Sequence, residues 1–108
     1  MKLGIIIYSN DPETVWNAFR FALQPLTKGD EVRVFLTGKG VEAQTGSLDT
    51  EEFPVDRMMR DVQDMGGEVL CCGSCSEKLR GTSPKSCPVG GLKDMYQIVV
   101  ESDRVLTF

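Results

Sequence analysis

The sequence predicts an α/β fold, a three-layer sandwich in which helices cover both faces of a mostly parallel sheet. Strand-like and helix-like segments alternate along the chain, which is typical of parallel strands joined by right-handed crossovers. Residues 3–9 are apolar on both faces, as in a strand buried on both sides of a sheet. The length of 108 residues, with 41% apolar and 26% charged residues, fits one soluble globular domain spanning residues 1–108.

A helix is expected directly after this first strand. Asp11 can cap free amides, Pro12 suits the first helical position, and Glu13 favours the positive end of a helix. Apolar residues then recur at helical spacing. Pro25 is expected to end or kink the helix, and Gly29 marks the following turn.

The next segments are a strand, a loop and a second helix. Residues 31–37 alternate apolar and polar side chains, which predicts the strand. Residues 38–50 hold three glycines and little pattern, so we expect mostly loop. Pro54 opens the second helix. Its methionines at helical spacing are expected in the core: Met58, Met59 and Met65.

The last third of the chain continues the alternation. Residues 68–72 are a short strand, and a brief helix follows and ends at Gly81. Residues 82–91 are expected to be a loop. A last amphipathic helix and a closing strand over residues 104–108 complete the fold. The apolar residues that define this helix are Leu92, Met95, Tyr96 and Val99.

Composition and charge exclude several classes of function. The formal net charge of −4 argues against direct nucleic-acid binding. The chain has no histidine, which excludes histidine-based triads and zincin sites. Because no apolar run approaches a membrane span and no signal peptide precedes the first strand, we expect a cytoplasmic protein without membrane contact. Thiols stay reduced there, so the four cysteines are expected to serve chemistry.

The functional residues are expected at one edge of the sheet. The carboxyl ends of parallel strands meet at one edge, and ligands bind there. Asn10 follows the first strand, residues 37–40 follow the second, and the cysteine cluster at residues 71–75 follows the third. Within residues 37–40 the Gly-Lys-Gly sequence lacks the full spacing of a phosphate-binding loop. We therefore treat it as a loop.

The cysteine cluster divides into residues with different expected roles. Successive strand residues point to opposite faces, so Cys71 and Cys72 should not share a site. Cys72 and Cys75 form a Cys-x-x-Cys unit at a helix start, where amides and the helix dipole favour the thiolate. A thiolate is the form that nucleophilic sulfur chemistry requires. Cys71 is expected to be a small buried residue, and Cys87 a solvent-side loop thiol.

Other polar residues have both a plain and a functional interpretation. Asn10, Lys39 and Arg80 are the candidate substrate-binding residues, since basic groups near the thiols suit anionic sulfur species. The plain interpretation makes three basic residues a solvated face: Lys78, Arg80 and Lys85. Trp16 and Arg20 lie one turn apart, which indicates surface stacking or a subunit contact.

Several short motifs follow one another in order along the chain. After the hydrophobic first strand they are the helix from Trp16 to Leu26, Glu31-Val32-Arg33-Val34-Phe35-Leu36, Gly40-Val41, Gly67-Glu68-Val69-Leu70-Cys71-Cys72, Leu79-Arg80-Gly81 and the closing Ser102-Asp103-Arg104-Val105-Leu106-Thr107-Phe108. Taken together, they resemble the DsrE/DsrF-like family of small sulfur-relay proteins over essentially the whole chain. The resemblance implies a flavodoxin-like, DsrE-type α/β sandwich that assembles as a trimer or hexamer.

The resemblance also implies an activity. In the relay members, a cysteine after the third main strand carries sulfur as a persulfide, received from a donor protein and passed to an acceptor protein, without a bound cofactor. That position falls on Cys72. Many relatives hold one cysteine there, whereas Cys71 and Cys75 flank Cys72 in this chain, so Cys75 can share the role.

Two other functions use the same cysteines. Cys72 and Cys75 could be a thiol–disulfide switch. Alternatively, the four thiolates could bind a metal or an iron–sulfur cluster. Only one Cys-x-x-Cys is present and Cys71 points away from Cys72, so the site residues are assigned to sulfur chemistry and none to a metal.

Overall fold

The computed structural model describes residues 1–81 and 86–108 and contains one five-stranded sheet. All strand pairs are parallel, and the spatial order is β4-β3-β2-β1-β5. The predicted α/β class is therefore confirmed. The strands are β1 (Lys2–Ile7), β2 (Glu31–Leu36), β3 (Glu68–Cys72), β4 (Val89–Gly90) and β5 (Arg104–Thr107).

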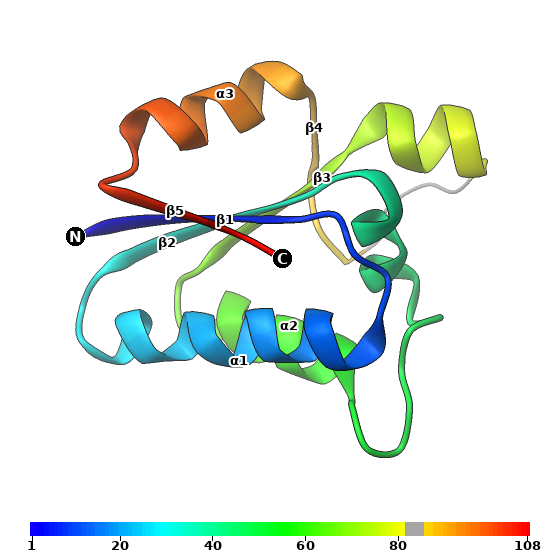
Figure 1. Ribbon diagram of the computed structural model, residues 1–108, viewed down its shortest axis with the longest axis horizontal. Coiled ribbons are helices and arrows are strands. Elements are labelled where there is room, and N and C mark those ends of the chain that lie inside the picture. The colour runs from blue at the N-terminus through cyan, green and yellow to red at the C-terminus, as the bar shows by residue number, and fades with distance from the viewer. Residues whose placement is uncertain (82–85) are drawn as a thin grey trace.

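Helices cover both faces of the sheet, which gives the three layers (Figure 1). The helices α1 (Pro12–Thr27) and α2 (Val55–Asp64) lie on one face, and α3 (Leu92–Glu101) lies on the other. The sheet interior is fully buried at Ile5, Val34 and Phe35. Helix α1 contributes Val15 and Phe19 to the same core. None of the described helices is long and apolar enough to cross a membrane.

The start of α1 follows the prediction, but its end does not. The Asp11 carboxylate accepts the backbone N–H of Thr14 at 2.9 Å, and this hydrogen bond lowers the pKa of Asp11. Pro25 does not end the helix, because α1 continues to Thr27. Pro25 lies in the last turn, so little helix remains beyond its missing N–H. Gly29, at φ 87°, makes the turn into β2.

Two segments expected to be loop contain regular structure. Gly38–Thr45 is a 3-10 helix, η1, and its Val41 and Ala43 are fully buried. Gly40 lies so close to β1 that an added Cβ would stand 2.2 Å from the carbonyl oxygen of Ile7. Val89–Gly90 forms β4, and two residues are too few to show a strand period. Residues 82–85 of that expected loop lie outside the described residues.

Two predictions about apolar faces were wrong. Met59 is buried, but Met65 is 44% exposed because it caps the end of α2 instead of lying within it. In α3 the buried residue is Ile98, with Met95 packed beside it. The outer side of α3 therefore carries exposed apolar side chains: Leu92, Tyr96, Val99 and Val100.

Candidate functional site

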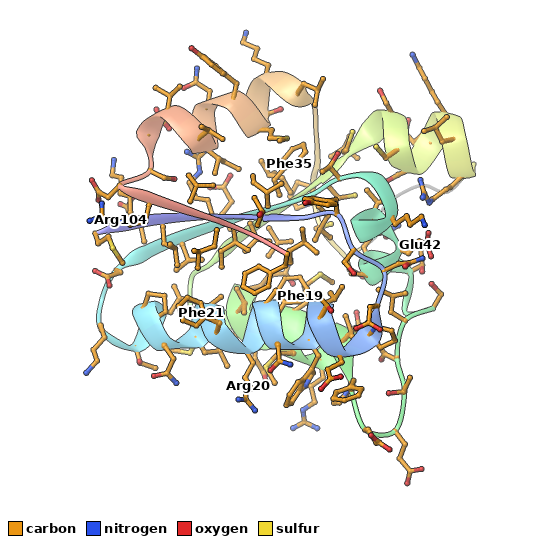
Figure 2. All side chains as sticks on the ribbon, viewed as in Figure 1. Phe19, Arg20, Phe21, Phe35, Glu42 and Arg104 are labelled. Atoms are coloured by element: carbon orange, nitrogen blue, oxygen red, sulfur yellow. The ribbon has the colours of Figure 1, made fainter. Side chains whose placement is uncertain are left out.

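The candidate site lies at the carboxyl ends of β1, β2 and β3. Asn10 follows β1, Thr37 and Gly38 follow β2, and Cys75 lies in the short helix after β3. That helix, η2 (Ser74–Lys78), is a π-helical turn, a rare form that is frequent at functional sites. Figure 2 shows Glu42, from η1, at the same end of the molecule.

Cys75 is the thiol that lies beside hydrogen-bond donors at this edge of the sheet. Its Sγ accepts the backbone N–H of Gly38 at 3.2 Å, and Thr37 Oγ1 lies 3.8 Å away. Burial raises the pKa of the Cys75 thiol, but the Gly38 amide opposes it. The side chains of Cys72 and Thr37 and the positive charge of Arg80 lower it further. The net pKa of Cys75 is lowered, so the thiolate is favoured.

Arg80 is tied to both the site and η1. Its Nη1 donates to the carbonyl oxygen of Cys75 at 3.0 Å, and its Nε donates to Glu42 Oε2 at 3.2 Å. Asn10 Nδ2 donates to the other carboxylate oxygen of Glu42 at 3.4 Å. Three of the strand ends are therefore joined by one network, which fixes the guanidinium beside Cys75. A solvated-face interpretation of Arg80 is wrong, because its side chain is only 26% exposed.

Cys72 is the buried neighbour of Cys75. It is 4% exposed, whereas Cys75 is partly exposed. The side chain of Cys72 interacts with Cys75 and helps to lower the pKa of that thiol. The Cys-x-x-Cys unit thus combines an accessible thiol with a second thiol immediately behind it, an arrangement suited to transfer of sulfur or to disulfide formation.

Cys71 belongs to a different group. It is fully buried, as expected, and its Sγ lies 3.4 Å from Ser76 Oγ. The prediction that Cys87 is a solvent-side thiol was wrong. Cys87 is 6% exposed and its thiol interacts with that of Cys71. The backbone explains this position, because the N–H of Cys71 donates to the carbonyl oxygen of Pro88 at 2.9 Å.

The other basic candidate residues do not share the contacts that Arg80 makes at the thiol site. Lys39 and Lys78 are exposed. Within the described ranges, Lys39 forms no ion pair or side-chain hydrogen bond. Lys85 lies outside the described residues. Among the candidate substrate-binding residues, Arg80 thus has contact with Cys75, Asn10 has indirect contact through Glu42, and Lys39 only flanks the site.

The four thiols do not converge on one point. Across residues 1–81 and 86–108, no group of three or more Cys, Asp or Glu side chains is placed to hold a metal ion. Cys72 interacts with Cys75, and Cys71 with Cys87. This division into pairs favours thiol chemistry over a four-thiolate site.

Trp16 and Arg20, one turn apart on α1, stack on each other at the surface. The guanidinium of Arg20 lies 4.9 Å from the ring centroid of Trp16, and Phe53 packs on Trp16 at 5.5 Å. Arg20 projects from the side of α1 away from the sheet, opposite to Phe19 (Figure 2). This stacking accounts for the spacing of Trp16 and Arg20 without a role in the candidate site.

Sequence reasoning placed Thr37 at this edge without giving it a role, and it missed Glu42 altogether. Glu42 lies 38 residues from Arg80, and no local pattern pairs them. The signal available was position alone, since both residues follow β2 at the edge where Cys72 ends β3. Because ligands bind at the carboxyl ends of parallel strands, every polar residue that follows such a strand is a candidate site residue, as the cysteines are.

The comparisons agree with the fold. The structure is similar to the crystal structure of the ychN protein from E. coli, with a TM-score of 0.84, 24% sequence identity and full coverage of both chains. Two archaeal relatives are similar in sequence. Uncharacterized protein MJ0989 of Methanocaldococcus jannaschii is 33% identical over the full length of both chains. Uncharacterized protein MK0008 of Methanopyrus kandleri is 35% identical, covering 89% of this chain and 83% of that protein.

The family comparison covers the whole chain. The model of the DsrE/DsrF-like family matches residues 1–108, the range over which the motifs of the sequence resemble that family. The chain therefore belongs to the DsrE/DsrF-like family.

Proposed function

We propose that this protein carries sulfur as a persulfide on the Cys72–Cys75 pair, with Cys75 receiving the sulfur. The observation that carries the proposal is the environment of Cys75 Sγ, which accepts the Gly38 N–H at 3.2 Å and has a lowered pKa. The same donors suit a persulfide, whose terminal sulfur is anionic. The family membership supports the chemistry, and the partial exposure of Cys75 supports its role as the receiving thiol.

The transfer step follows from a thiolate at Cys75. The thiolate attacks the terminal sulfur of a persulfide on a donor protein. A new S–S bond forms on Cys75, the S–S bond of the donor breaks, and the donor cysteine leaves as a thiolate. An acceptor thiolate then attacks the terminal sulfur in the same way and restores Cys75. No net oxidation or reduction occurs, so no cofactor is required.

Partner proteins must reach Cys75 for this relay. Tyr8 and Leu79, 56% and 75% exposed, flank the site with apolar surface, and Lys39 adds a positive charge. The exposed outer side of α3 offers a further apolar surface, which supports assembly as a homo-oligomer, a trimer or hexamer. We place this relay in the cytoplasm, where thiols stay reduced.

Intact mass of anaerobically purified protein tests the proposal. After exposure to a cysteine desulfurase and cysteine, we expect added sulfur that reductant removes and that maps to Cys75. The Cys75→Ser variant should take up no sulfur, because a serine hydroxyl does not ionise near neutral pH. Cys87→Ser is the matched control and should load normally. Sulfur that still loads on Cys75→Ser but not on Cys72→Ser would transfer the receiving role to Cys72.

A thiol–disulfide switch is the second candidate, favoured by the contact between Cys72 and Cys75. In this case mild oxidation removes two hydrogen atoms and links these two residues, and the donor adds no sulfur. The same mass measurement therefore separates the two functions.

A further inference from the structure

The thiols outside the candidate site form a pair of their own, between β3 and the start of β4. Cys71 pairs with Val89 in the parallel register, and its N–H donates to the carbonyl oxygen of Pro88 at 2.9 Å. Cys87 is the residue before Pro88, so the backbone hydrogen bond brings its side chain next to Cys71. The preceding residue, Ser86, is also held, because Gln63 Nε2 donates to its carbonyl oxygen at 2.9 Å and its hydroxyl donates to Gln44 at 3.1 Å.

This pair differs from the candidate site in access and in partners. Cys71 is 0% and Cys87 6% exposed, so a large donor protein cannot contact their sulfur atoms. Their polar neighbour is the Ser76 hydroxyl, 3.4 Å from Cys71 Sγ. The hydrogen bond with Cys87 lowers the pKa of Cys71 to about 7, and the same interaction raises the pKa of Cys87. One thiol is thus poised as the anion and the other as the proton donor.

We propose that Cys71 and Cys87 are a redox pair, which hydrogen peroxide converts into an intramolecular disulfide. The Cys71 thiolate attacks one oxygen of the peroxide, so that an S–O bond forms while the O–O bond breaks. The leaving hydroxide takes a proton from solvent and departs as water. The Cys87 thiol then loses its proton and attacks that sulfur. The S–O bond breaks, the S–S bond forms, and a second water leaves. Two thiols are oxidised and one peroxide is reduced to two waters.

The Cys71–Cys87 disulfide would enclose residues of the candidate site in a cross-linked loop. It closes a loop that contains residues 72–86, and this segment carries Cys72, Cys75 and Arg80. Cross-linking a loop of this length restricts the unfolded chain. Oxidation is therefore expected to hold β4 on β3 and to raise the melting temperature by roughly 10–15 °C. The inference is independent of the proposed function, because it uses neither Cys72 nor Cys75.

The test uses the full chain with only the two relevant thiols, Cys72→Ser/Cys75→Ser. Treatment with hydrogen peroxide should remove two hydrogen atoms without forming dimers, and peptide mapping should link Cys71 to Cys87. The melting temperature should rise, and reductant should reverse both changes. Adding Cys87→Ser gives the matched control. It removes the resolving thiol, so the peroxide should add oxygen to Cys71 instead of removing hydrogen.

Three results would overturn the inference: no loss of hydrogen from the two-thiol protein, cross-linking only between chains, or a melting temperature unchanged by oxidation. If the serine substitutions disturb folding, mapping of peroxide-treated wild-type protein answers the same question, since the Cys71–Cys87 peptide must appear there too. If this experiment fails, the proposal of sulfur loading on Cys75 still stands. If sulfur loading fails, the proposal of a Cys71–Cys87 disulfide still stands.

Discussion

Cys71 and Cys72 are neighbours in sequence, yet they belong to two regions with opposite properties. Cys72 ends β3 beside the partly exposed Cys75, at the edge where Gly38 and Arg80 supply a donor and a charge. Cys71 is enclosed with Ser76 and Cys87. The cause is the two-residue period of a strand, which sends adjacent side chains to opposite faces. One strand end can therefore serve two thiol pairs, one that contains the partly exposed Cys75 (the accessible pair) and one in which both thiols are buried (the buried pair).

The largest difference between the two regions should be in stability. Cys71→Ser places a hydroxyl at a fully buried position, where it finds fewer partners than in water, and should lower the free energy of unfolding by about 1–3 kcal/mol. Cys75→Ser, at a partly exposed position, should change it by less than about 0.5 kcal/mol. Chemical denaturation under reducing conditions measures both. Equal losses for the two variants would contradict the division into a buried and an accessible pair.

The next effect concerns reactivity within the accessible pair. Cys72→Ala removes a hydrogen-bond partner that lowers the pKa of Cys75, so this pKa should rise. Alkylation depends on the thiolate, so the iodoacetamide rate of Cys75 at pH 7 should fall about threefold. The difference should vanish well above the pKa, where Cys75 is fully ionised in both proteins.

The Cys71→Ala/Cys87→Ser variant provides the control for this comparison. It removes both buried thiols and should leave the alkylation profile of Cys75 in place, since neither contributes to its pKa. If the alkylation profile of Cys75 shifted in the Cys71→Ala/Cys87→Ser variant but not in Cys72→Ala, Cys72 would not be the thiol that lowers the pKa of Cys75.

The two regions also differ in how far the sequence predicts them. The alternating segments predict β1, α1, β2, α2, β3, α3 and β5, because each is long enough for its apolar period to appear. The separation of Cys71 from Cys72 follows from the strand period in the same way. The position of Cys87 does not, since it depends on the Cys71–Pro88 backbone hydrogen bond and on Gln63 holding Ser86. These contacts join distant segments and leave no local pattern.

The candidate site shows the same limit. Cys75 and Arg80 were identified from the spacing around one motif. Glu42 was not, because η1 is a 3-10 helix with little apolar period and its carboxylate pairs with residues 32 and 38 positions away. The edge of a parallel sheet predicts which residues gather, but their mutual hydrogen bonds depend on side-chain geometry.

The smallest expected effect comes from the charge of Arg80. Its Coulombic influence is the weakest of the causes that lower the pKa of Cys75, so Arg80→Met should raise this pKa slightly and reduce alkylation at pH 7 about twofold. Lys78→Met is the matched control, because it removes the same charge from an exposed position two residues earlier, at the end of η2. Salt should weaken the Arg80 effect only in part, since that side chain is 26% exposed and solvent screens it incompletely. If Lys78→Met changed the rate as much as Arg80→Met, the net charge of the helix would explain the lowered pKa, and the network through Glu42 would not be needed to position the guanidinium beside Cys75.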